Sequence, residues 1–302
     1  MGLSDKTYGI QLQTDIGEIG FNHPILPEIR SMSAHPSLLW RAFTSLTFVV
    51  IACSFGTVAI AQNTDRPELP HGPLRQTILL GETLVRQTDT HPLTREFVGN
   101  SLQCSSCHLD GGQHPQAATF IGVAAAYPAW APREQKVITL EDRILNCFLR
   151  SQNGTRPAAG SEPSVAIAAY ITWLSEGTKL KMNAKQSLGP HHITMLTSPK
   201  LPASIDRGKQ LYADRCQDCH ADNGSGTDDG PAVWGDESYN DGAGLAKVPK
   251  LASWLKVAMP PDEADLSVQA SFDLAAYLNS HPRPHFEPPA LSVPHIETPA
   301  AQ

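Results

Sequence analysis

The chain has 302 residues, which is enough for two modest domains. Hydrophobic residues make up 41% of it and aromatic residues only 7%, so a large apolar cofactor in each domain would explain how such small cores stay folded. The formal net charge of −7 argues against a nucleic-acid partner, because phosphate binding requires a basic face. An anionic substrate would need a local cluster of Arg or Lys.

The N-terminal segment predicts export from the cytoplasm. Residues 1–31 precede a second methionine, Met32, and are interpreted as an untypical leader or a misassigned start. The apolar run over 42–61 ends in Ala-Ile-Ala, a small-x-small cleavage pattern, so 32–61 is predicted to be a signal peptide. A membrane anchor is the alternative, because the run is nearly long enough to span a bilayer. The mature protein is expected in the periplasm, an oxidising compartment.

Two regions after the signal peptide follow the same plan. Apolar residues at helical spacing predict a helix over 74–88 and another over 204–216, each leading into a C-x-x-C-H sequence. Further helices are predicted over 163–177 and 271–281, where "AAYITWL" and "AAYLNSH" occupy equivalent places and indicate duplication of one module. No strand pattern is convincing, so the fold class is mostly α. The predicted division is 62–185 for the N-terminal domain, 186–203 for a linker, 204–282 for the C-terminal domain and 283–302 for a Pro-rich tail.

The two C-x-x-C-H sequences are the most specific feature of the chain. They consist of Cys104, Cys107 and His108, and of Cys216, Cys219 and His220. In this attachment sequence of c-type haem, the thiols form thioethers with the haem vinyl groups and the imidazole binds the iron as proximal ligand. Three alternatives are disfavoured. A zinc site would need two cysteine pairs close together, but these pairs lie in separate modules. A thioredoxin-like redox pair needs a βαβ context, which is absent from the sequence pattern, and structural disulfides do not require the His. Two covalently bound haem c groups are therefore predicted.

The candidates for the distal iron ligands differ between the two regions. In the second region, Met259 is the only methionine after His220, and a Met ligand raises the potential of a haem. Lys256 is an alternative ligand, and a methionine of the hydrophobic core is the alternative reading of Met259.

The first region has no methionine between His108 and its closing helix, but it has Cys147. This is the unpaired thiol that remains when four others hold haem and Cys53 is removed with the signal peptide. A thiolate ligand would stabilise ferric iron and lower the haem potential, which suggests chemistry on sulfur rather than simple electron transfer. A small buried hydrophobe is the alternative. The other candidate ligands are His114, which lies close to His108 in the sequence, and Met182, His191 and His192, which follow the closing helix.

Several motifs together resemble the dihaem thiosulfate dehydrogenase family of periplasmic cytochromes. They are "CSSCHLDGG", "TLEDRILNCFLRSQNG", "AAYITWLSEG", "CQDCHADNGSG", "YNDGAG" and "MP" followed by "AAYLNSHPRP", and they span about 72–284. The resemblance implies two class I cytochrome c domains in tandem. It also implies that two thiosulfate ions are oxidised and coupled to tetrathionate with release of two electrons, a reaction that some members run in reverse.

The resemblance also implies roles for individual residues. Cys147 would be the distal ligand and the catalytic sulfur of the first haem, and Arg133, Arg143 and Ser151 would hold the substrate. Guanidinium groups bind oxyanions through paired hydrogen bonds, which supports this role in an acidic protein. The alternative reading of both arginines is that they are solvated helix charges or partners of the haem propionates. Arg150 is a weaker candidate.

Some family members carry a lysine immediately before the distal methionine, where this chain has Ala258, so an exchange of ligands would require Lys256. The predicted function is oxidation of thiosulfate at a His/Cys-ligated haem, where Cys147 forms a transient sulfur adduct that a second thiosulfate attacks. Electrons would pass to the Met259 haem and then to an external acceptor, soluble or membrane-bound, such as another cytochrome. The alternative is a non-catalytic dihaem electron carrier, which would not explain a cysteine ligand with arginines nearby.

Overall fold

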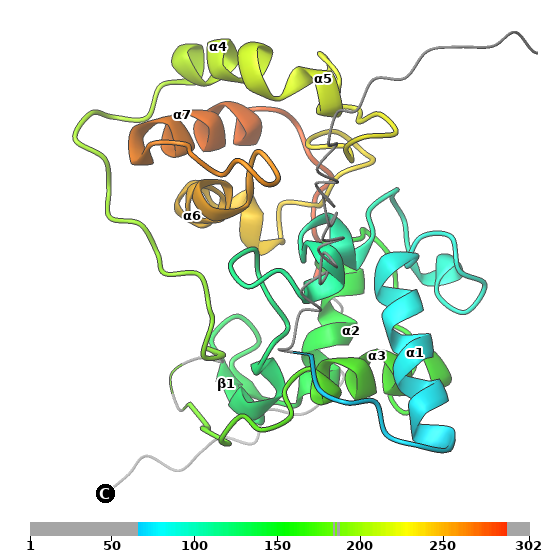
Figure 1. Cartoon of the computed structure of the whole chain (residues 1–302). Helices are drawn as coiled ribbons and strands as arrows, with labels where there is room; N and C mark the ends of the chain where they lie inside the picture. Colours follow the sequence, from blue (N-terminus) through cyan, green and yellow to red (C-terminus); the bar gives the residue numbers. More distant parts are fainter. Residues whose placement is uncertain (1–65, 184, 186–187, 289–302) are drawn as a thin grey trace, which may run out of the picture. The chain divides into compact units, whose positions relative to one another are not determined.

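The computed structural model describes residues 66–183, 185 and 188–288 (Figure 1), all of which belong to the same compact unit of the chain. The leader predicted over 1–31 and the signal peptide predicted over 32–61 lie outside the described residues, as does most of the predicted tail. No helix of the described part is long and apolar enough to cross a membrane.

The first region combines α-helices with short 3-10 turns and one small sheet. Its elements are α1 (Pro73–Arg86), η1 (Arg95–Phe97), η2 (Cys104–Ser106), η3 (Asp110–Gly112), η4 (Val123–Ala126), β1 (Ala129–Ala131), β2 (Lys136–Ile138), α2 (Leu140–Arg150) and α3 (Glu162–Trp173). The two strands pair antiparallel, with Trp130 opposite Val137. The sequence predicted no strand, because segments of three residues are too short to show alternation. The mostly α fold class is confirmed.

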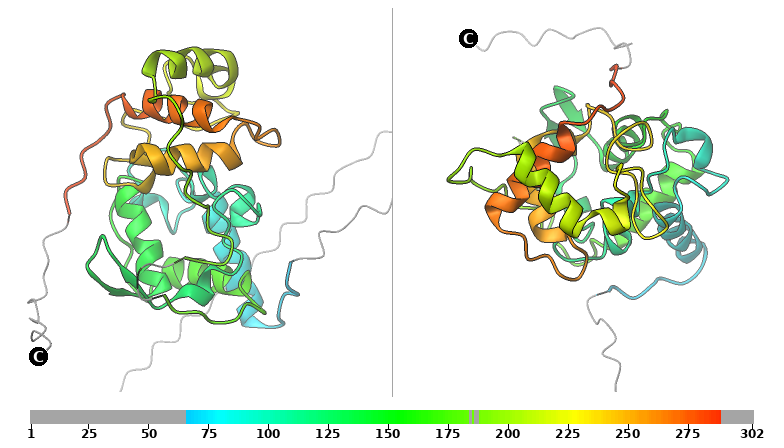
Figure 2. Two further views of the ribbon diagram at one scale, coloured as in Figure 1. Left: turned by 90° about the vertical axis from the view of Figure 1, so that its left-hand side faces the viewer. Right: turned by 90° about the horizontal axis from the view of Figure 1, so that it is seen from above.

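The second region is helical throughout its ordered elements. They are α4 (Ile205–Arg215), α5 (Gln217–His220), η5 (Gly244–Ala246), α6 (Val248–Ala258) and α7 (Val268–Asn279). Figure 2 shows α4, α7 and α6 stacked on one another. The four predicted helices correspond to α1, α3, α4 and α7 with ends displaced by a few residues, whereas α2 and α6 were not predicted.

Side-chain caps and prolines explain where the helices begin. The Thr139 hydroxyl accepts a hydrogen bond from the Asp142 N–H at 3.1 Å, and the Asp142 carboxylate accepts one from the Thr139 N–H at 3.4 Å, which forms a capping box at the start of α2. Ser204 and Ser267 cap α4 and α7 through their hydroxyls. α1, α3 and α6 have a proline in the first turn, where its missing N–H leaves no helix hydrogen bond unmade.

The opening and closing helices of each region cross at a glycine. A Cβ on Gly81 of α1 would lie 2.0 Å from the carbonyl oxygen of Ala166 in α3. In the same way, a Cβ on Gly208 of α4 would lie 2.1 Å from the carbonyl oxygen of Asp273 in α7. In both closing helices, the fourth residue after this contact is a tyrosine, whose Cβ also approaches the glycine. The two crossings are therefore equivalent, which supports duplication of one module.

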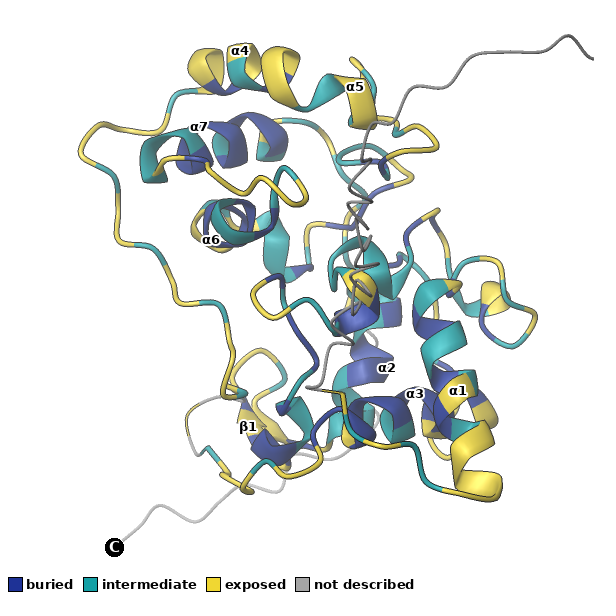
Figure 3. Ribbon diagram, in the orientation of Figure 1, coloured by how far each residue is buried: buried dark blue, intermediate teal, exposed yellow. Residues whose placement is uncertain are grey.

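Each region has its own hydrophobic core. The first core includes Ile78, Leu84, Phe148, Ile167, Tyr170 and Trp173, and the second includes Tyr212, Leu251, Trp254, Phe272, Leu274 and Tyr277. Figure 3 shows α6 and α7 as largely buried, whereas α4 is mostly exposed. The closing helices thus form the centre of each core, and the opening helices cover them.

Side-chain amides connect the two regions. Asn153 Nδ2 donates to the Ser238 carbonyl oxygen at 2.7 Å, and Asn240 Nδ2 donates to the Leu149 carbonyl oxygen at 2.8 Å. The Asn240 backbone N–H also donates to the carbonyl oxygen of Arg150 at 3.2 Å. The loop that precedes η5 therefore lies against the C-terminal end of α2.

Candidate functional site

The first C-x-x-C-H sequence is anchored at the end of α1. The Thr88 hydroxyl donates to the Leu84 carbonyl oxygen at 2.7 Å and accepts from the Cys104 backbone N–H at 3.1 Å. Gln103 and Ser106 form a capping box around η2. Because the Thr88 side chain is fully buried, these hydrogen bonds fix the first cysteine firmly. The sequence did not predict this role for Thr88.

His108 is held in its neutral form with one ring nitrogen free. Its Nδ1–H donates to the carbonyl oxygen of Ala118, and its ring packs against Phe120 with the centroids 4.3 Å apart. Burial, reinforced by the charge of Arg143, lowers the pKa of His108 to about 4. Since Nδ1 carries the proton, Nε2 has the lone pair that an iron ion would need.

The second C-x-x-C-H sequence repeats this arrangement. His220, the last residue of α5, donates from Nδ1 to the Pro231 carbonyl oxygen at 2.8 Å. A Cβ on Gly230 would lie 3.0 Å from the atoms of this ring, so only glycine leaves the His ring in place. The Tyr212 hydroxyl donates to the Ala221 carbonyl oxygen at 2.6 Å and holds the end of α5 against α4.

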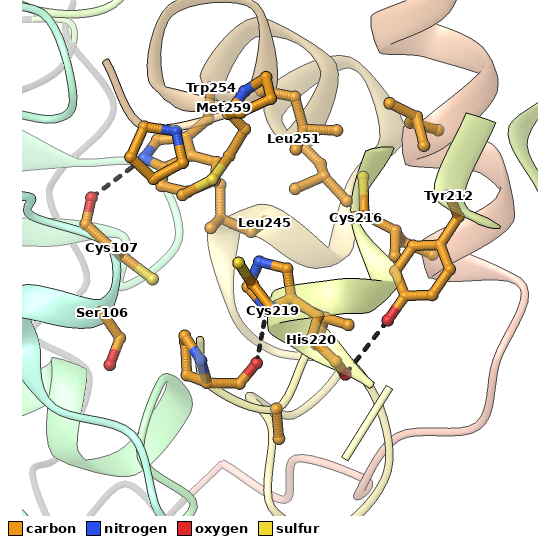
Figure 4. Close-up of a pocket in the computed structure, with 18 of the residues that line it drawn as sticks. Ser106, Cys107, Tyr212, Cys216, Cys219, His220, Leu245, Leu251, Trp254 and Met259 are labelled. Carbon is orange, nitrogen blue, oxygen red and sulfur yellow. Dashed lines mark hydrogen bonds between the residues drawn. The ribbon is translucent and has the colours of Figure 1, made fainter. Parts of the chain in front are cut away.

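A cavity lined by α4 to α7 adjoins His220. It encloses about 950 Å³, part of which is open to solvent, and Figure 4 shows the Met259 sulfur and the His220 ring both pointing into it. Met259 follows α6 directly, and its N–H donates to the Leu255 carbonyl oxygen at 3.1 Å. The other lining residues are mainly apolar and include Leu102, Leu245, Leu251, Trp254, Leu266, Leu274 and Leu278. Lys256, the alternative ligand predicted from the sequence, does not line this cavity.

A second cavity, of about 1420 Å³ and also partly open to solvent, adjoins His108. The structure brings three of the predicted site residues into its wall together with the first C-x-x-C-H sequence, namely Arg143, Cys147 and Ser151. His191 and His192 of the linker also line this cavity, whereas His114 and Met182 do not. The cavity thus contains the predicted proximal and distal ligands of one haem.

Cys147 and Arg143 lie one turn apart on α2. The Cys147 thiol points back along the helix and donates to the Arg143 carbonyl oxygen at 3.5 Å. The electrostatic effect of the Cys147 sulfur is the largest cause of the raised pKa of Arg143, and a hydrogen bond with Tyr127 contributes to it as well. The Cys147 sulfur and the Arg143 guanidinium therefore share one wall of the cavity.

Arg133 and Arg150 occupy different positions from Arg143. Arg133 does not line the cavity, and its Nη1 donates to the Gly242 carbonyl oxygen of the second region at 3.0 Å. Arg150 pairs with Glu134 at 3.2 Å, and its guanidinium lies 4.3 Å from the centre of the Phe286 ring. Arg143 is consequently the arginine that an ion inside the cavity would meet.

The chemistry of both sites fits c-type haem. Burial raises the pKa of the Cys104 and Cys107 thiols to about 12, so neither has the low pKa that a redox-active dithiol requires. Each cysteine pair adjoins a His with a free Nε2 and a cavity with a mainly apolar wall, the kind of site in which a large apolar cofactor binds. Within the described part of the chain, no three His, Cys, Asp or Glu residues lie close enough to hold a metal ion.

The fold and the two C-x-x-C-H sites define a c-type cytochrome with two cytochrome c domains. Residues 97–180 match the family model described as "SoxA/TsdA, cytochrome c domain", and residues 203–278 match the model described as "Cytochrome C oxidase, cbb3-type, subunit III". These matches confirm the prediction of two cytochrome c domains and imply haem c as the cofactor.

Known relatives then identify the family. The chain is 35% identical over 229 residues to thiosulfate dehydrogenase of Stutzerimonas stutzeri (74% of this chain, 72% of the relative). It is 37% identical over 232 residues to thiosulfate dehydrogenase of Allochromatium vinosum (73% and 83%). A solved structure of thiosulfate dehydrogenase (TsdBA) from Marichromatium purpuratum is similar with a TM-score of 0.67 and 34% identity, over 72% of this chain and 49% of that one. The chain belongs to the thiosulfate dehydrogenase family.

Proposed function

We propose that this chain is a periplasmic thiosulfate dehydrogenase that couples two thiosulfate ions to tetrathionate. The observation that carries the proposal is the position of the Cys147 sulfur and the Arg143 guanidinium in the cavity that adjoins His108. A dianion that enters this cavity meets a nucleophilic sulfur and a fixed cation on consecutive turns of one helix. A simple electron carrier has no use for either group.

The proposed reaction has two steps at the Cys147 sulfur. In the first, the thiolate and the outer sulfur of one thiosulfate form an S–S bond with loss of two electrons, which gives a Cys–S–S–SO₃⁻ adduct. In the second, the outer sulfur of another thiosulfate attacks the adduct at the sulfur bonded to Cys147, displaces the thiolate and leaves as tetrathionate. Arg143 and Ser151 orient the sulfonate oxygens through hydrogen bonds, with the charged guanidinium making the stronger contact.

The haem groups supply the one-electron acceptors that this oxidation needs. In the proposal, Cys104 and Cys107 hold one of them and Cys216 and Cys219 hold the other. The chain would offer His108 and Cys147 to the first iron, and His220 and Met259 to the second. With these ligands, a thiolate at one site and a thioether at the other, the first haem would have a lower potential than the second, which would favour electron flow from the first site to the second.

The two sites share part of their walls. Leu102 and Cys107 line both cavities, and Trp254, in the wall of the cavity that adjoins His220, donates from Nε1 to the Cys107 carbonyl oxygen at 3.0 Å (Figure 4). In the proposal, electrons would cross this shared wall from the first site to the second. We propose that they leave from the second site to an external acceptor, either soluble or membrane-bound, such as another cytochrome.

Anaerobic mixing of the oxidised holoprotein with thiosulfate tests the proposal. The haem absorption bands should change to those of the reduced form, tetrathionate should accumulate in the presence of an artificial acceptor, and the mass should correspond to two haems per chain. A stable dihaem protein that thiosulfate does not reduce, and that makes no tetrathionate, would favour the electron-carrier alternative. Mixing the reduced protein with tetrathionate tests the reverse reaction, because tetrathionate would oxidise the haems, and the relative rates report the preferred direction.

A further inference from the structure

Arg283 is a half-buried cation that no described carboxylate pairs with. It follows α7 within the motif "AAYLNSHPRP", and it has no part in the reaction proposed above. Its Nη2 donates to the carbonyl oxygens of Val233 at 2.8 Å and Leu278 at 3.3 Å, and its guanidinium lies 3.9 Å from the centre of the Tyr239 ring. Within the described residues Arg283 forms no ion pair. Because these partners are neutral, the protein leaves the charge of the guanidinium uncompensated.

The residues that Arg283 contacts belong to the wall of the cavity that adjoins His220. Val233, Tyr239 and Leu278 all line this cavity (Figure 4), whereas Arg283 itself does not. The cation therefore lies directly behind the wall. Since the wall is mainly apolar, it screens the charge from the cavity less than water would.

One hydrogen-bond donor of Arg283 has no partner. Its Nε is buried and forms no hydrogen bond within the described part of the chain, although Nη1 donates to the Ser238 hydroxyl at 3.2 Å. Burial lowers the pKa of Arg283, and Tyr239 opposes this effect. A buried charged group with an unsatisfied donor is costly to the fold, so its presence calls for a function.

The chain around Arg283 is held in place without its side chain. The Pro282 carbonyl oxygen accepts a hydrogen bond from the Gly235 N–H at 3.2 Å, and the Pro284 carbonyl oxygen accepts one from the Asp241 N–H at 3.0 Å. The backbone on both sides of Arg283 is thus fixed to the loop that precedes η5. Anchoring of this segment is therefore not the only use of the guanidinium.

The first domain has a different residue at the equivalent position. The tyrosine at the helix crossing is Tyr170 in the first domain and Tyr277 in the second. Six residues later, the first domain has Glu176, which is exposed, and the second has Arg283. The cation is consequently not part of the framework that the two domains share, and it distinguishes the second site from the first.

We infer that Arg283 supplies a fixed positive charge that raises the potential of the haem at the second site. This inference rests on the proposed function, in which the second haem receives electrons from the first. Reduction lowers the charge of a haem by one unit, so a cation behind the cavity wall favours the reduced state. The same cation offsets the negative charge of the haem propionates. It acts in the same direction as a Met259 ligand, which also raises the potential.

Redox titration of the holoprotein with a chemical reductant tests this role without thiosulfate. Arg283→Gln removes the charge but keeps a hydrogen-bond donor, and Arg283→Lys keeps the charge but loses the planar guanidinium. Lys209→Gln, which changes an exposed lysine of α4 outside the cavity wall, makes the same change of net charge elsewhere in the domain. Absorption spectra of each variant show whether the ligands of both haems are retained.

We expect the ratio of reduced to oxidised second haem at a given potential to fall about tenfold in Arg283→Gln, because a unit charge in a weakly screened interior changes an equilibrium by about this factor. For a one-electron couple this corresponds to about 59 mV. Arg283→Lys should keep most of the wild-type potential, and Lys209→Gln should keep all of it. The first haem should titrate as in the wild type in all three variants.

A second variant tests the same charge if Arg283→Gln does not fold. Asn279 Oδ1 accepts a hydrogen bond from Arg283 Nη2 at 3.2 Å. Asn279→Asp has the same size and would neutralise the guanidinium while it stays in place. The potential of the second haem should therefore fall by a similar factor in Asn279→Asp.

Other results would overturn the inference. An unchanged second potential in Arg283→Gln, or in Asn279→Asp where Arg283→Gln does not fold, would show that the charge does not act on the haem. An equal fall in Arg283→Gln and Arg283→Lys, with lower stability to denaturant, would make Arg283 a structural residue. A wild type that thiosulfate does not reduce would instead reject the proposed function, and the titration would still decide the role of Arg283.

Discussion

The two cytochrome c domains are alike in their framework and different in the segment that completes the wall of the cavity beside the C-x-x-C-H histidine. Both cross their opening and closing helices at a glycine, and both fix the C-x-x-C-H histidine through Nδ1 to a backbone carbonyl. The first domain then presents Cys147 and Arg143 from α2, whereas the second presents Met259 from the end of α6 in a wall that is mainly apolar.

This difference shows how one module can serve two purposes. The crossed opening and closing helices and the anchored C-x-x-C-H histidine recur in both domains, whereas the segment between the C-x-x-C-H sequence and the closing helix differs. A charged, partly open wall suits the binding of anions, while an apolar wall with a thioether suits a stable, high-potential electron carrier. The variants below either remove the difference between the domains or increase it.

Replacing Cys147 should have the largest effect. Cys147→Ser should retain both haems, because attachment depends on the four cysteines of the C-x-x-C-H sequences. Thiosulfate oxidation should collapse, since the sulfur that carries the adduct is missing, and the potential of the first haem should rise with loss of the thiolate. Haem content, redox titration and turnover measure these effects. Normal turnover in this variant would reduce Cys147 to a small buried hydrophobe.

Cys147→Met separates ligation from chemistry and makes the first site resemble the second. A thioether can bind iron but cannot form the S–S adduct, so we expect a six-coordinate spectrum, a raised potential and no turnover. Substantial turnover with a thioether would mean that Cys147 acts only as a ligand.

The arginines should show the next largest effect. Arg143→Ala should lower kcat/KM for thiosulfate by one to two decades, because loss of a charge-assisted hydrogen bond costs about 1.5–3 kcal/mol. Arg133→Ala tests the substrate contact predicted from the sequence and should lower kcat/KM as well, by a smaller factor, because Arg133 does not line the cavity. Arg75→Ala, an exposed arginine of α1, is the matched control. Wild-type kinetics in both test variants, with a shifted haem potential, would make them propionate partners.

The framework of each domain could be predicted from the sequence because its signals are local. The apolar spacing of α1, α3, α4 and α7 follows from burial of one helix face, and the C-x-x-C-H sequences mark both haem sites. α2 and α6 were missed, although the Thr139–Asp142 capping box and Pro249 in the first turn of α6 mark where they begin. A closer reading of helix start signals would have found both.

Contacts between the two regions could not be predicted. Trp254 donates to Cys107 across 147 positions of the sequence, and Arg133 donates to Gly242 across 109. No periodicity links such residues, since their proximity depends on how the two modules pack. The same reason explains why Arg143 faces the cavity while Arg133, assigned the same role from sequence, faces the second region.

Met259→Ala should affect the second domain alone. Loss of the thioether should lower the potential of the second haem and slow onward electron transfer, while thiosulfate still reduces the first haem. Separate redox titration of the two haems and stopped-flow reduction by thiosulfate measure the two effects. Met182→Ala, which changes a largely exposed methionine, is the control. An unchanged second potential would point to another ligand, with Lys256 the first to examine.

The two frameworks differ at the helix crossing. The residue of the closing helix that contacts the glycine is Ala166 in the first domain and Asp273 in the second. A substitution of Asp273 therefore tests what its carboxylate adds to the second framework. The buried carboxylate accepts hydrogen bonds from the Ser204 N–H at 2.8 Å and from Arg207 at 2.7 Å. Burial alone would raise the pKa of Asp273, but the hydrogen bonds outweigh it and hold the pKa below its usual value. A depressed carboxyl pKa adds stability above the unfolded value of about 4, and this stability is lost as the pH falls further.

Asp273→Ala should therefore lower the free energy of unfolding of the second domain by about 1–3 kcal/mol at neutral pH, since the start of α4 loses its acceptor. The cost should stay moderate because Arg207 is 44% exposed and remains solvated. Below pH 4 the difference between variant and wild type should shrink as Asp273 takes up its proton. Asp214→Ala, an exposed carboxylate on α4, should cost little at any pH. Denaturant unfolding at pH 7 and pH 3 measures this, and a pH-independent difference would mean that packing of the side chain, rather than its charge, holds the two helices together.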